Sequence, residues 1–380
     1  MKKVLIAAST LSHIENFHIP YLKHFKDLGF EIHVIGKKNK DCTIPYADKV
    51  ICIDFEKKMI SLKNILNILK ISKLIRSEKY FLIYTHTILA SFFTRLGVVF
   101  SLTKIPIIIN TVHGYLFDKN SSWVKKIIML SAEKSVSFIT DYILVMNNED
   151  YNIAKKYNLY KKNLFLIKGM GFNSDLFNKV TNENKLKLRS EYNFSKNDFI
   201  LIYVAEFSKR KNQKFLVNSI KKLSDRGFSN IKLLLIGDGS LLEDVKKYSS
   251  ELGVYENIVF AGYKKNTNDY YNLSDICVSA SRIEGLPFNI MESMSCGLPV
   301  VASNIKGHSD LISPNLNGFL YNYNDTDAFC NYIETLLKDK MLIQNMSKNN
   351  IIKSLEYSSK NVLKTNIELI DKLVDTKLTL

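Results

Sequence analysis

The sequence predicts an α/β protein made of two doubly wound, Rossmann-like domains that face each other across a cleft. The chain has 380 residues, more than a single hydrophobic core usually serves. Short β-branched apolar runs alternate with helical stretches, as parallel sheets covered on both faces require. A polar segment at 173–198 separates the runs into two series. We therefore expect an N-terminal domain over 1–178 and a C-terminal domain over 179–360.

Each apolar run is expected to form a strand of one of the two sheets. The runs lie at 4–8, 31–36, 81–85, 105–110 and 142–146 in the first half, and at 199–205, 231–237, 257–262, 276–281 and 299–303 in the second. The last segment, 361–380, reads as an amphipathic helix that packs back toward the N-terminal domain. Ligands of doubly wound sheets bind outside the carboxyl ends of the strands, so function is expected in the loops there.

Basic residues are concentrated in the first half of the chain. The sequence has 53 Lys and Arg against 37 Asp and Glu, a net charge of +16. Residues 1–180 carry 27 basic and 14 acidic side chains, a net +13, whereas residues 181–380 carry 26 and 23, a net +3. Such a field attracts the phosphates of a membrane surface, a phosphorylated substrate or a nucleic acid.

The cysteines and the hydropathy indicate a cytoplasmic protein. The five cysteines are scattered and contain no C-x-x-C pair, so neither a disulfide framework nor a zinc site is expected. The most apolar stretch, 98–109, is broken by Lys104 and Pro106, and it is shorter than the ~20 residues that a spanning helix needs. We expect a chain that can lie on the inner face of the plasma membrane without crossing it.

The most informative segment is 281–303, SRIEGLPFNIMESMSCGLPVVAS. Gly285 permits a close backbone approach, and Pro287 suits the first turn of a helix. The start of that helix offers free amide donors to a phosphate. Glu284 and Glu292 place carboxylates on either side, and carboxylates accept hydrogen bonds from sugar hydroxyls. A nucleotide sugar combines these two features.

This segment resembles the signature of the retaining glycosyltransferases of family 4, which have the two-domain architecture called GT-B. The matching residues are Glu284, Gly285, Pro287, Glu292, Met294, Gly297, Pro299, Val300, Val301 and Ala302. Ser293 and Ser295 stand where alanines are commoner. The resemblance implies that Glu284 holds the hydroxyls of the transferred sugar and Glu292 those of the ribose. Gly285, Leu286 and Pro287 then line the donor site.

A basic loop, 203–213, follows the first strand of the second half. Lys211 stands where the family has a lysine that, together with an arginine, neutralises the donor diphosphate. A fixed cation stabilises the charge that develops on the leaving group. The family's usual Gly-Arg dipeptide is Ala205-Glu206 here, so Arg210 is the candidate for the second cation. A solvated basic loop is the alternative.

Two further turns of the second half match the family's nucleotide side. Gly237 ends a strand in the family's G-x-G turn, and Phe260, Gly262 and Tyr263 are expected near the base. Core packing explains these apolar residues equally well.

The first half is expected to hold the acceptor. His113 ends a strand at the predicted cleft, and family members often have a histidine there that contacts the donor sugar or the acceptor. Ser12 and His13 are candidates on the acceptor side, whereas His86 is expected to be structural. The form of the first turn resembles the branch that acts in exopolysaccharide and capsule assembly, whose acceptors are usually sugars on a lipid diphosphate such as undecaprenyl diphosphate.

Independently of this resemblance, the basic segment 57–79 has apolar residues at helical spacing. A helix of this kind can lie on the anionic headgroups of the inner leaflet, although a surface helix of an α/β domain has the same pattern. The apolar positions are Ile60, Leu62, Ile65, Leu66, Leu69, Ile71, Leu74 and Ile75.

The expected activity is transfer of a sugar, with retention, from a nucleotide sugar (UDP-sugar favoured) to a hydroxyl of a glycan acceptor. No metal or other cofactor is expected, because Lys211 and helix amides can stabilise the leaving group. Two alternatives remain open. A nucleotide-sugar epimerase would need no acceptor. A basic module binding membranes or nucleic acid would use the charge, but the two motif glutamates would repel phosphates, so nucleic acid is not expected as a partner.

Overall fold

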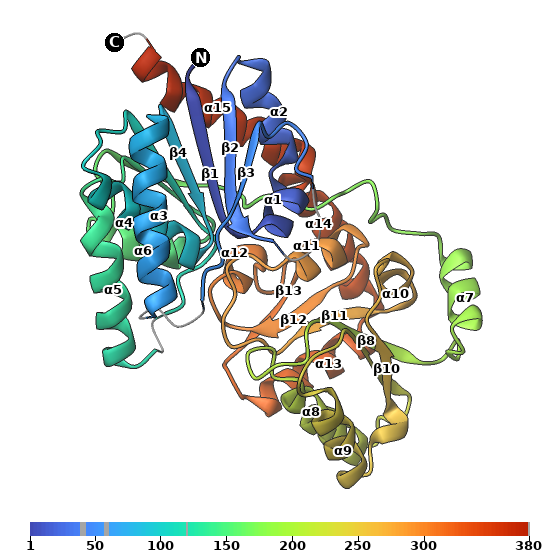
Figure 1. Ribbon diagram of the computed structural model, residues 1–380. Helices are drawn as coiled ribbons and strands as arrows, with labels where there is room; N and C mark the ends of the chain where they lie inside the picture. Colours follow the sequence, from blue (N-terminus) through green and yellow to red (C-terminus); the bar gives the residue numbers. More distant parts are fainter. Residues whose placement is uncertain (39–42, 57–60, 119–120, 379–380) are drawn as a thin grey trace. The chain divides into compact units, whose positions relative to one another are not determined.

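The computed structural model describes residues 1–38, 43–56, 61–118 and 121–378, which form two compact units (Figure 1). Unit 1 comprises Met1–Met170 and Val362–Leu380, and unit 2 comprises Gly171–Asn361. The division falls after Met170, where the sequence suggested 178. Cys42 and residues 57–60 of the predicted basic helix lie outside the described residues.

Unit 1 contains a parallel sheet of seven strands in the order β3-β2-β1-β4-β5-β6-β7. The bounds are β1 (Lys3–Thr10), β2 (Glu31–Lys37), β3 (Lys49–Cys52), β4 (Leu82–His86), β5 (Ile107–Val112), β6 (Tyr142–Val145) and β7 (Asn163–Leu166). The sequence did not predict β3 and β7. Both are four-residue edge strands, and the short apolar runs at 50–53 and 164–167 were not assigned to strands in the sequence analysis.

Helices cover both faces of this sheet. They are α1 (Leu11–Phe17), α2 (Ile19–Asp27), α3 (Leu62–Glu78), α4 (Ile88–Ser101), α5 (Trp123–Ser137) and α6 (Asn148–Lys156). The last helix, α15 (Ser359–Leu378), enters unit 1 at Val362. The amide of Asn366 on α15 donates hydrogen bonds to the Tyr21 hydroxyl (3.0 Å) and the Gly169 carbonyl (3.1 Å), which fixes the helix within unit 1.

Unit 2 contains a parallel sheet of six strands in the order β10-β9-β8-β11-β12-β13. The bounds are β8 (Phe199–Val204), β9 (Ile231–Ile236), β10 (Ile258–Gly262), β11 (Ile276–Ser279), β12 (Val300–Ser303) and β13 (Gly318–Tyr321). The sequence missed β13, a four-residue edge strand that begins with glycine. Near-continuous burial of β8, β9, β11 and β12 explains why their apolar runs predicted them.

The helices of unit 2 surround its sheet. They are α7 (Asn182–Glu191), α8 (Gln213–Asp225), α9 (Leu242–Glu251), α10 (Asn268–Leu273), α11 (Phe288–Ser295), α12 (His308–Leu311), α13 (Thr326–Lys338) and α14 (Lys340–Ser354), with short 3₁₀ turns η1 (Tyr255–Asn257) and η2 (Leu355–Tyr357). Helix α7 lies in the polar segment that separates the two strand series. Ion pairs of Lys185 and Arg189 with Asp275 hold it, which hydrophobic periodicity could not reveal.

Candidate active site

Two loops at the carboxyl edge of the unit 2 sheet are hydrogen-bonded to each other. One follows β8 and the other follows β11. The backbone N–H of Arg282 donates to the Arg210 carbonyl (2.9 Å), and the Tyr203 hydroxyl bridges the Lys211 carbonyl (3.1 Å) and the Ser281 hydroxyl (2.8 Å). The basic loop is therefore fixed beside the EGLP turn.

The side chains on these loops form a compact charged cluster. The Lys211 ammonium lies 2.6 Å from Oε1 of Glu284, and a guanidinium nitrogen of Arg210 lies 3.0 Å from Oε2. Side-chain exposure is 12% for Lys211, 9% for Glu284 and 44% for Arg210. Both cations hold one carboxylate, so the cluster has a net charge of +1.

The electrostatics of the cluster keep Glu284 ionised. Burial alone would raise the pKa of its carboxyl, but Lys211 and Arg210 outweigh burial and hold the pKa below its ordinary value. Burial lowers the pKa of the Lys211 ammonium, and the charge of Glu284 opposes this change. A buried lysine held beside a carboxylate and a partly exposed arginine can attract an anion such as a diphosphate.

Behind the EGLP turn lies a second loop that the sequence analysis did not use. Gly307 has a φ of +79°, and a Cβ there would lie 2.6 Å from the Gly285 carbonyl oxygen. The neighbouring His308 is fully buried between Ser279 and Ser303. Burial lowers the pKa of His308 to about 4, although Glu284 opposes this shift. In the sequence, a Gly-His pair shortly after the apolar run of β12 is the signal that could have identified this loop.

The second motif glutamate lies on α11. Pro287 occupies the N-cap position of this helix, not the first helical turn expected from the sequence. Glu292 accepts a hydrogen bond of 3.0 Å from the Tyr271 hydroxyl, and burial raises the pKa of its carboxyl. Tyr271 was missed by the sequence analysis, because no local pattern links α10 to α11. Leu286 is buried in the turn before the helix.

The turns after β9 and β10 lie against the basic loop. Gly237 has a φ of +142°, and a Cβ there would lie 2.1 Å from the Ala205 carbonyl oxygen, so only glycine fits. Its N–H donates to the Gly262 carbonyl (3.0 Å). Phe260 is half-buried in β10 and contacts the ring of Phe207, whereas Tyr263 is exposed.

Two family models match most of the chain. The model described as "Glycosyl transferases group 1" matches residues 184–353, and the model described as "Glycosyl transferase 4-like" matches residues 4–142. The chain is a family 4-like glycosyltransferase. This finding confirms the family and the enzyme class that the motif at 284–302 predicted.

Relatives of the glycosyltransferase extend along nearly its whole length. The putative glycosyltransferase EpsD of Bacillus subtilis is 28% identical over 374 residues, 98% of this chain and 97% of EpsD. An Escherichia coli protein named UDP-Gal:alpha-D-GlcNAc-diphosphoundecaprenol alpha-1,3-galactosyltransferase is 26% identical over 345 residues, 89% of this chain and 88% of that protein.

Solved structures confirm the GT-B fold. Sucrose-phosphate synthase from Thermosynechococcus elongatus superposes with a TM-score of 0.78 at 17% identity, covering 99% of this chain and all of that chain. Anabaena HepE in complex with UDP superposes with a TM-score of 0.76 at 17% identity, covering 98% of this chain and all of that chain.

Unit 1 of the glycosyltransferase holds a histidine cluster at the carboxyl ends of β1, β4 and β5. The cluster contains the predicted His13 and His113, and also His86 and His18. The ring centroids of His13 and His113 lie 4.8 Å apart, and those of His18 and His86 lie 3.9 Å apart. Ser12, beside them, donates a hydrogen bond of 3.1 Å to the Thr10 hydroxyl. The sequence analysis missed His18, because only the turn between α1 and α2 brings this residue back to His86 at the end of β4.

Burial keeps these imidazoles neutral. It lowers the pKa of His13 to about 4 and that of His113 to about 3, and it lowers the pKa of His18 and His86 well below the ordinary value. Ring nitrogens of His13, His18 and His113 lie within 4.8 Å of one another, which is close enough for the three histidines to hold a metal ion.

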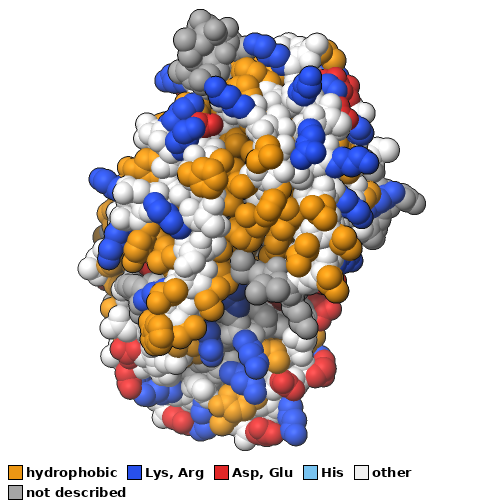
Figure 2. All heavy atoms as spheres, turned by 60° about the vertical axis from the view of Figure 1, so that its left-hand side comes forward, with side chains coloured by type: hydrophobic (Ala, Val, Ile, Leu, Met, Phe, Trp, Pro, Cys, Tyr) orange, Lys and Arg blue, Asp and Glu red, His pale blue; other side chains and the backbone are white. Residues whose placement is uncertain are grey.

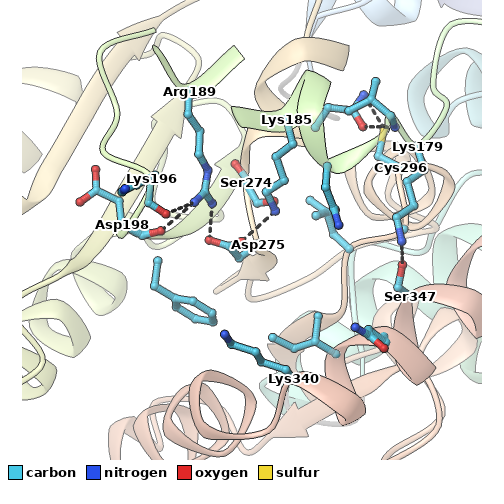
Figure 3. Close-up of a pocket in the computed structure, with 18 of the residues that line it drawn as sticks. Lys179, Lys185, Arg189, Lys196, Asp198, Ser274, Asp275, Cys296, Lys340 and Ser347 are labelled. Carbon is cyan, nitrogen blue, oxygen red and sulfur yellow. Dashed lines mark hydrogen bonds and ion pairs between the residues drawn. The ribbon is translucent and has the colours of Figure 1, made fainter. Parts of the chain in front are cut away.

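A cavity of about 630 Å³ in unit 2 lies away from the Glu284 cluster. It opens at the amino ends of β8 and β11, the edge of the sheet opposite Glu284. Figure 3 shows Lys185 and Arg189 directed at Asp275, with bonds of 2.8 Å and 2.6 Å. Arg189 also donates to the Leu273 carbonyl (2.9 Å). These cations therefore hold α7 against the sheet.

Proposed function

We propose that this glycosyltransferase moves a sugar from a nucleotide-sugar donor, a UDP-sugar in the favoured case, to a hydroxyl of a lipid-diphosphate-linked glycan. The anomeric configuration is retained, and the reaction belongs to cell-surface polysaccharide biosynthesis. The observation that carries the proposal is the buried carboxylate of Glu284 held by Lys211 and Arg210 beside the start of α11.

In this mechanism Lys211 and Arg210 bind the donor diphosphate. The cluster has two cations and one carboxylate, so one positive charge remains after the charge of Glu284 has been neutralised. The leaving nucleoside diphosphate gains negative charge as the glycosidic bond breaks, and the fixed cations stabilise that charge more than they stabilise the ground state. Amides at the start of α11 add to this stabilisation, and we propose that no metal ion is needed.

The two motif glutamates then have different tasks. Glu284 is fixed by its cations and accepts hydrogen bonds from the hydroxyls of the transferred sugar. Glu292 accepts hydrogen bonds from the ribose hydroxyls, and the Tyr271 hydroxyl positions its carboxylate. The acceptor hydroxyl attacks the face from which the diphosphate departs, and a phosphate oxygen of the donor takes its proton. Gly237, Phe260, Gly262 and Tyr263 are proposed around the base.

We propose that His113 is a catalytic residue that contacts the transferred sugar or the acceptor, and that His13 and Ser12 lie on the acceptor side. Neutral imidazoles can donate to and accept from sugar hydroxyls, and burial keeps His13 and His113 neutral at pH 7. The name of the Escherichia coli relative, with its UDP-sugar donor and diphosphoundecaprenol acceptor, supports the proposed substrates, as do the HepE complexes with UDP and with UDP-glucose.

The test compares the intact chain with Glu292→Ala. A thermal-shift screen against UDP-, GDP-, ADP- and TDP-sugars should show the largest rise in melting temperature with a UDP-sugar. The substitution removes charged hydrogen bonds worth about 1.5–3 kcal/mol each, so UDP affinity should fall roughly 10- to 100-fold.

Glu243→Ala, at an exposed position on α9, is the matched control and should bind UDP as the intact chain does. NMR of the product should show the anomeric configuration of the donor. Normal transfer by Glu292→Ala would refute the site, and an inverted product would refute retention.

A further inference from the structure

The first half of helix α3 turns apolar side chains outward and polar side chains inward, whereas the second half buries Ile71 and Ile75. Leu62 is 81% exposed, and the exposed apolar positions recur at helical spacing on one face. They are Leu62, Ile65, Leu66 and Leu69. The opposite face buries Asn64 and Asn67. An ordinary surface helix has the reverse arrangement.

The buried asparagines fix this orientation. Asn64 accepts a hydrogen bond from the Glu56 N–H (3.0 Å) and donates to the Glu56 carbonyl (3.1 Å). Asn67 donates to the Asp54 carbonyl (2.9 Å). Rotating α3 to bury its leucines would break these bonds and leave buried amides unsatisfied. The exposed stripe is therefore built into the structure.

Helix α5 has a similar exposed face. Trp123, the chain's one tryptophan, is 73% exposed at the start of the helix. The inward face carries Glu133, which is ion-paired with the buried Arg95 (2.9 Å). The exposed apolar residues of α5 are Trp123, Val124, Ile127 and Ile128.

Helix α4 contacts both α3 and α5, and Figure 1 draws α3 and α5 on the same side of unit 1. Figure 2 turns forward the side on which Figure 1 draws α3 and α5, and hydrophobic side chains gather across it with lysines and arginines around them. We call the exposed apolar residues of α3 and α5 the apolar face.

The charges on these helices are almost all positive. The basic residues are Lys63, Lys70, Lys73 and Arg76 on α3, and Lys125, Lys126 and Lys134 on α5. The acidic residues of the two helices are Glu78 and Glu133, and both are in ion pairs, with Lys3 and Lys49 and with Arg95. Cations around an apolar stripe complement a surface of anionic headgroups over hydrocarbon.

We propose that the apolar face of α3 and α5 docks unit 1 onto an anionic lipid bilayer. Leucine and isoleucine enter the boundary between headgroups and acyl chains, Trp123 lies at headgroup level, and the lysines contact lipid phosphates. None of the helices among the described residues has the length and hydropathy of a membrane-spanning segment. The inference deepens the proposed function, on which it rests for a lipid-linked acceptor.

Trp123 supplies a direct measurement on the intact chain. Binding to vesicles of phosphatidylcholine with roughly 30 mol% of the anionic lipid phosphatidylglycerol should shift the Trp123 emission to the blue. Brominated acyl chains in the same vesicles should quench it. Pure phosphatidylcholine should give a weaker shift, and salt near ~1 M should weaken binding because it screens the lysines.

Two variants on α3 separate the apolar and electrostatic parts. Leu66→Ser should reduce vesicle binding several-fold by removing apolar contact. The double variant Lys70→Gln, Lys73→Gln should weaken binding by roughly fivefold per charge, for anionic vesicles only. Ile352→Ser, which changes a 68% exposed isoleucine of unit 2, is the matched control and should bind as the intact chain does. Circular dichroism of each variant checks folding.

Unchanged Trp123 emission with anionic vesicles would overturn the proposal. A dimer in solution that Leu66→Ser dissociates, without vesicle binding, would overturn it in favour of an interface between copies. Vesicle binding needs neither donor nor acceptor. A chain that binds vesicles but transfers no sugar therefore contradicts the proposed function alone, and a chain that transfers sugar without vesicle binding contradicts docking alone.

Discussion

Acidification to pH 5 should destabilise unit 1 through its histidine cluster. A histidine that is neutral when folded takes up a proton only on unfolding, once the pH falls below its unfolded pKa of about 6.5. Burial lowers the pKa of His13 to about 4 and that of His113 to about 3. Between pH 6.5 and 4 the unfolded state therefore binds more protons, and the free energy of unfolding falls as the pH falls.

The magnitude follows from the distance between pH 5 and the unfolded pKa. Each pH unit is worth about 1.4 kcal/mol for one proton, so His13 and His113 each cost about 2 kcal/mol at pH 5. Together they remove about 4 kcal/mol, a large share of the stability of a typical domain. The pKa values of His18 and His86 are lowered too, which adds to the loss. Carboxylates of ordinary pKa contribute little above pH 5.

Urea unfolding at pH 7 and pH 5 measures the effect. Circular dichroism follows the unfolding, because Trp123 is already 73% exposed in the folded chain and its emission changes little. The double variant His13→Gln, His113→Gln should lose about 4 kcal/mol of the difference between the two pH values. An intact chain with equal unfolding free energy at pH 7 and pH 5 would refute the reasoning, as would a double variant that keeps the full pH dependence.

Two further substitutions test other parts of the structure. Gly307→Ala places a Cβ 2.6 Å from the backbone of the EGLP turn at a φ of +79°, so it should lower the melting temperature and weaken UDP binding. Gly253→Ala, at a φ of +68° with nothing within 4 Å, should cost only the backbone strain of about 1–2 kcal/mol and leave UDP binding unchanged. Equal UDP binding by both variants would contradict the role of the glycine behind the turn. Arg95→Met leaves Glu133 buried without its cation and should destabilise unit 1 by about 3–5 kcal/mol in urea unfolding, whereas Arg95→Met with Glu133→Leu should recover part of that loss; no recovery would argue against the pair.

Features determined by contiguous residues could be predicted from the sequence. The motif at 284–302 contains its turn, its helix and both glutamates in one segment, so its resemblance to the family signature predicted the family and the enzyme class. Strands buried on both faces are apolar along their length, and β8 and β11 were predicted for that reason. The edge strand β3 is apolar from Val50 to Cys52 although its side chains are largely exposed, so a short apolar run did not distinguish it from a loop.

Features determined by contacts between distant segments needed the tertiary structure. The sequence proposed Arg210 as a partner of Lys211, but only the folded chain shows both cations on the Glu284 carboxylate, 73 or more residues away. Tyr271 and Glu292 meet for the same reason.

The apolar periodicity of 57–79 determined that a helix forms there, and its basic residues were visible as well. Periodicity does not say which side of a helix faces the sheet. On α3 the hydrogen bonds of Asn64 and Asn67 to the preceding loop fix the rotation of the first half. They leave Leu62, Leu66 and Leu69 in solvent, whereas Ile71 and Ile75 are buried further along the helix. The sequence alone determined the family, the two sheets and the excess of positive charge. The tertiary structure decided which side chains share a site and which face outward, because those depend on groups that the chain brings together only when it folds.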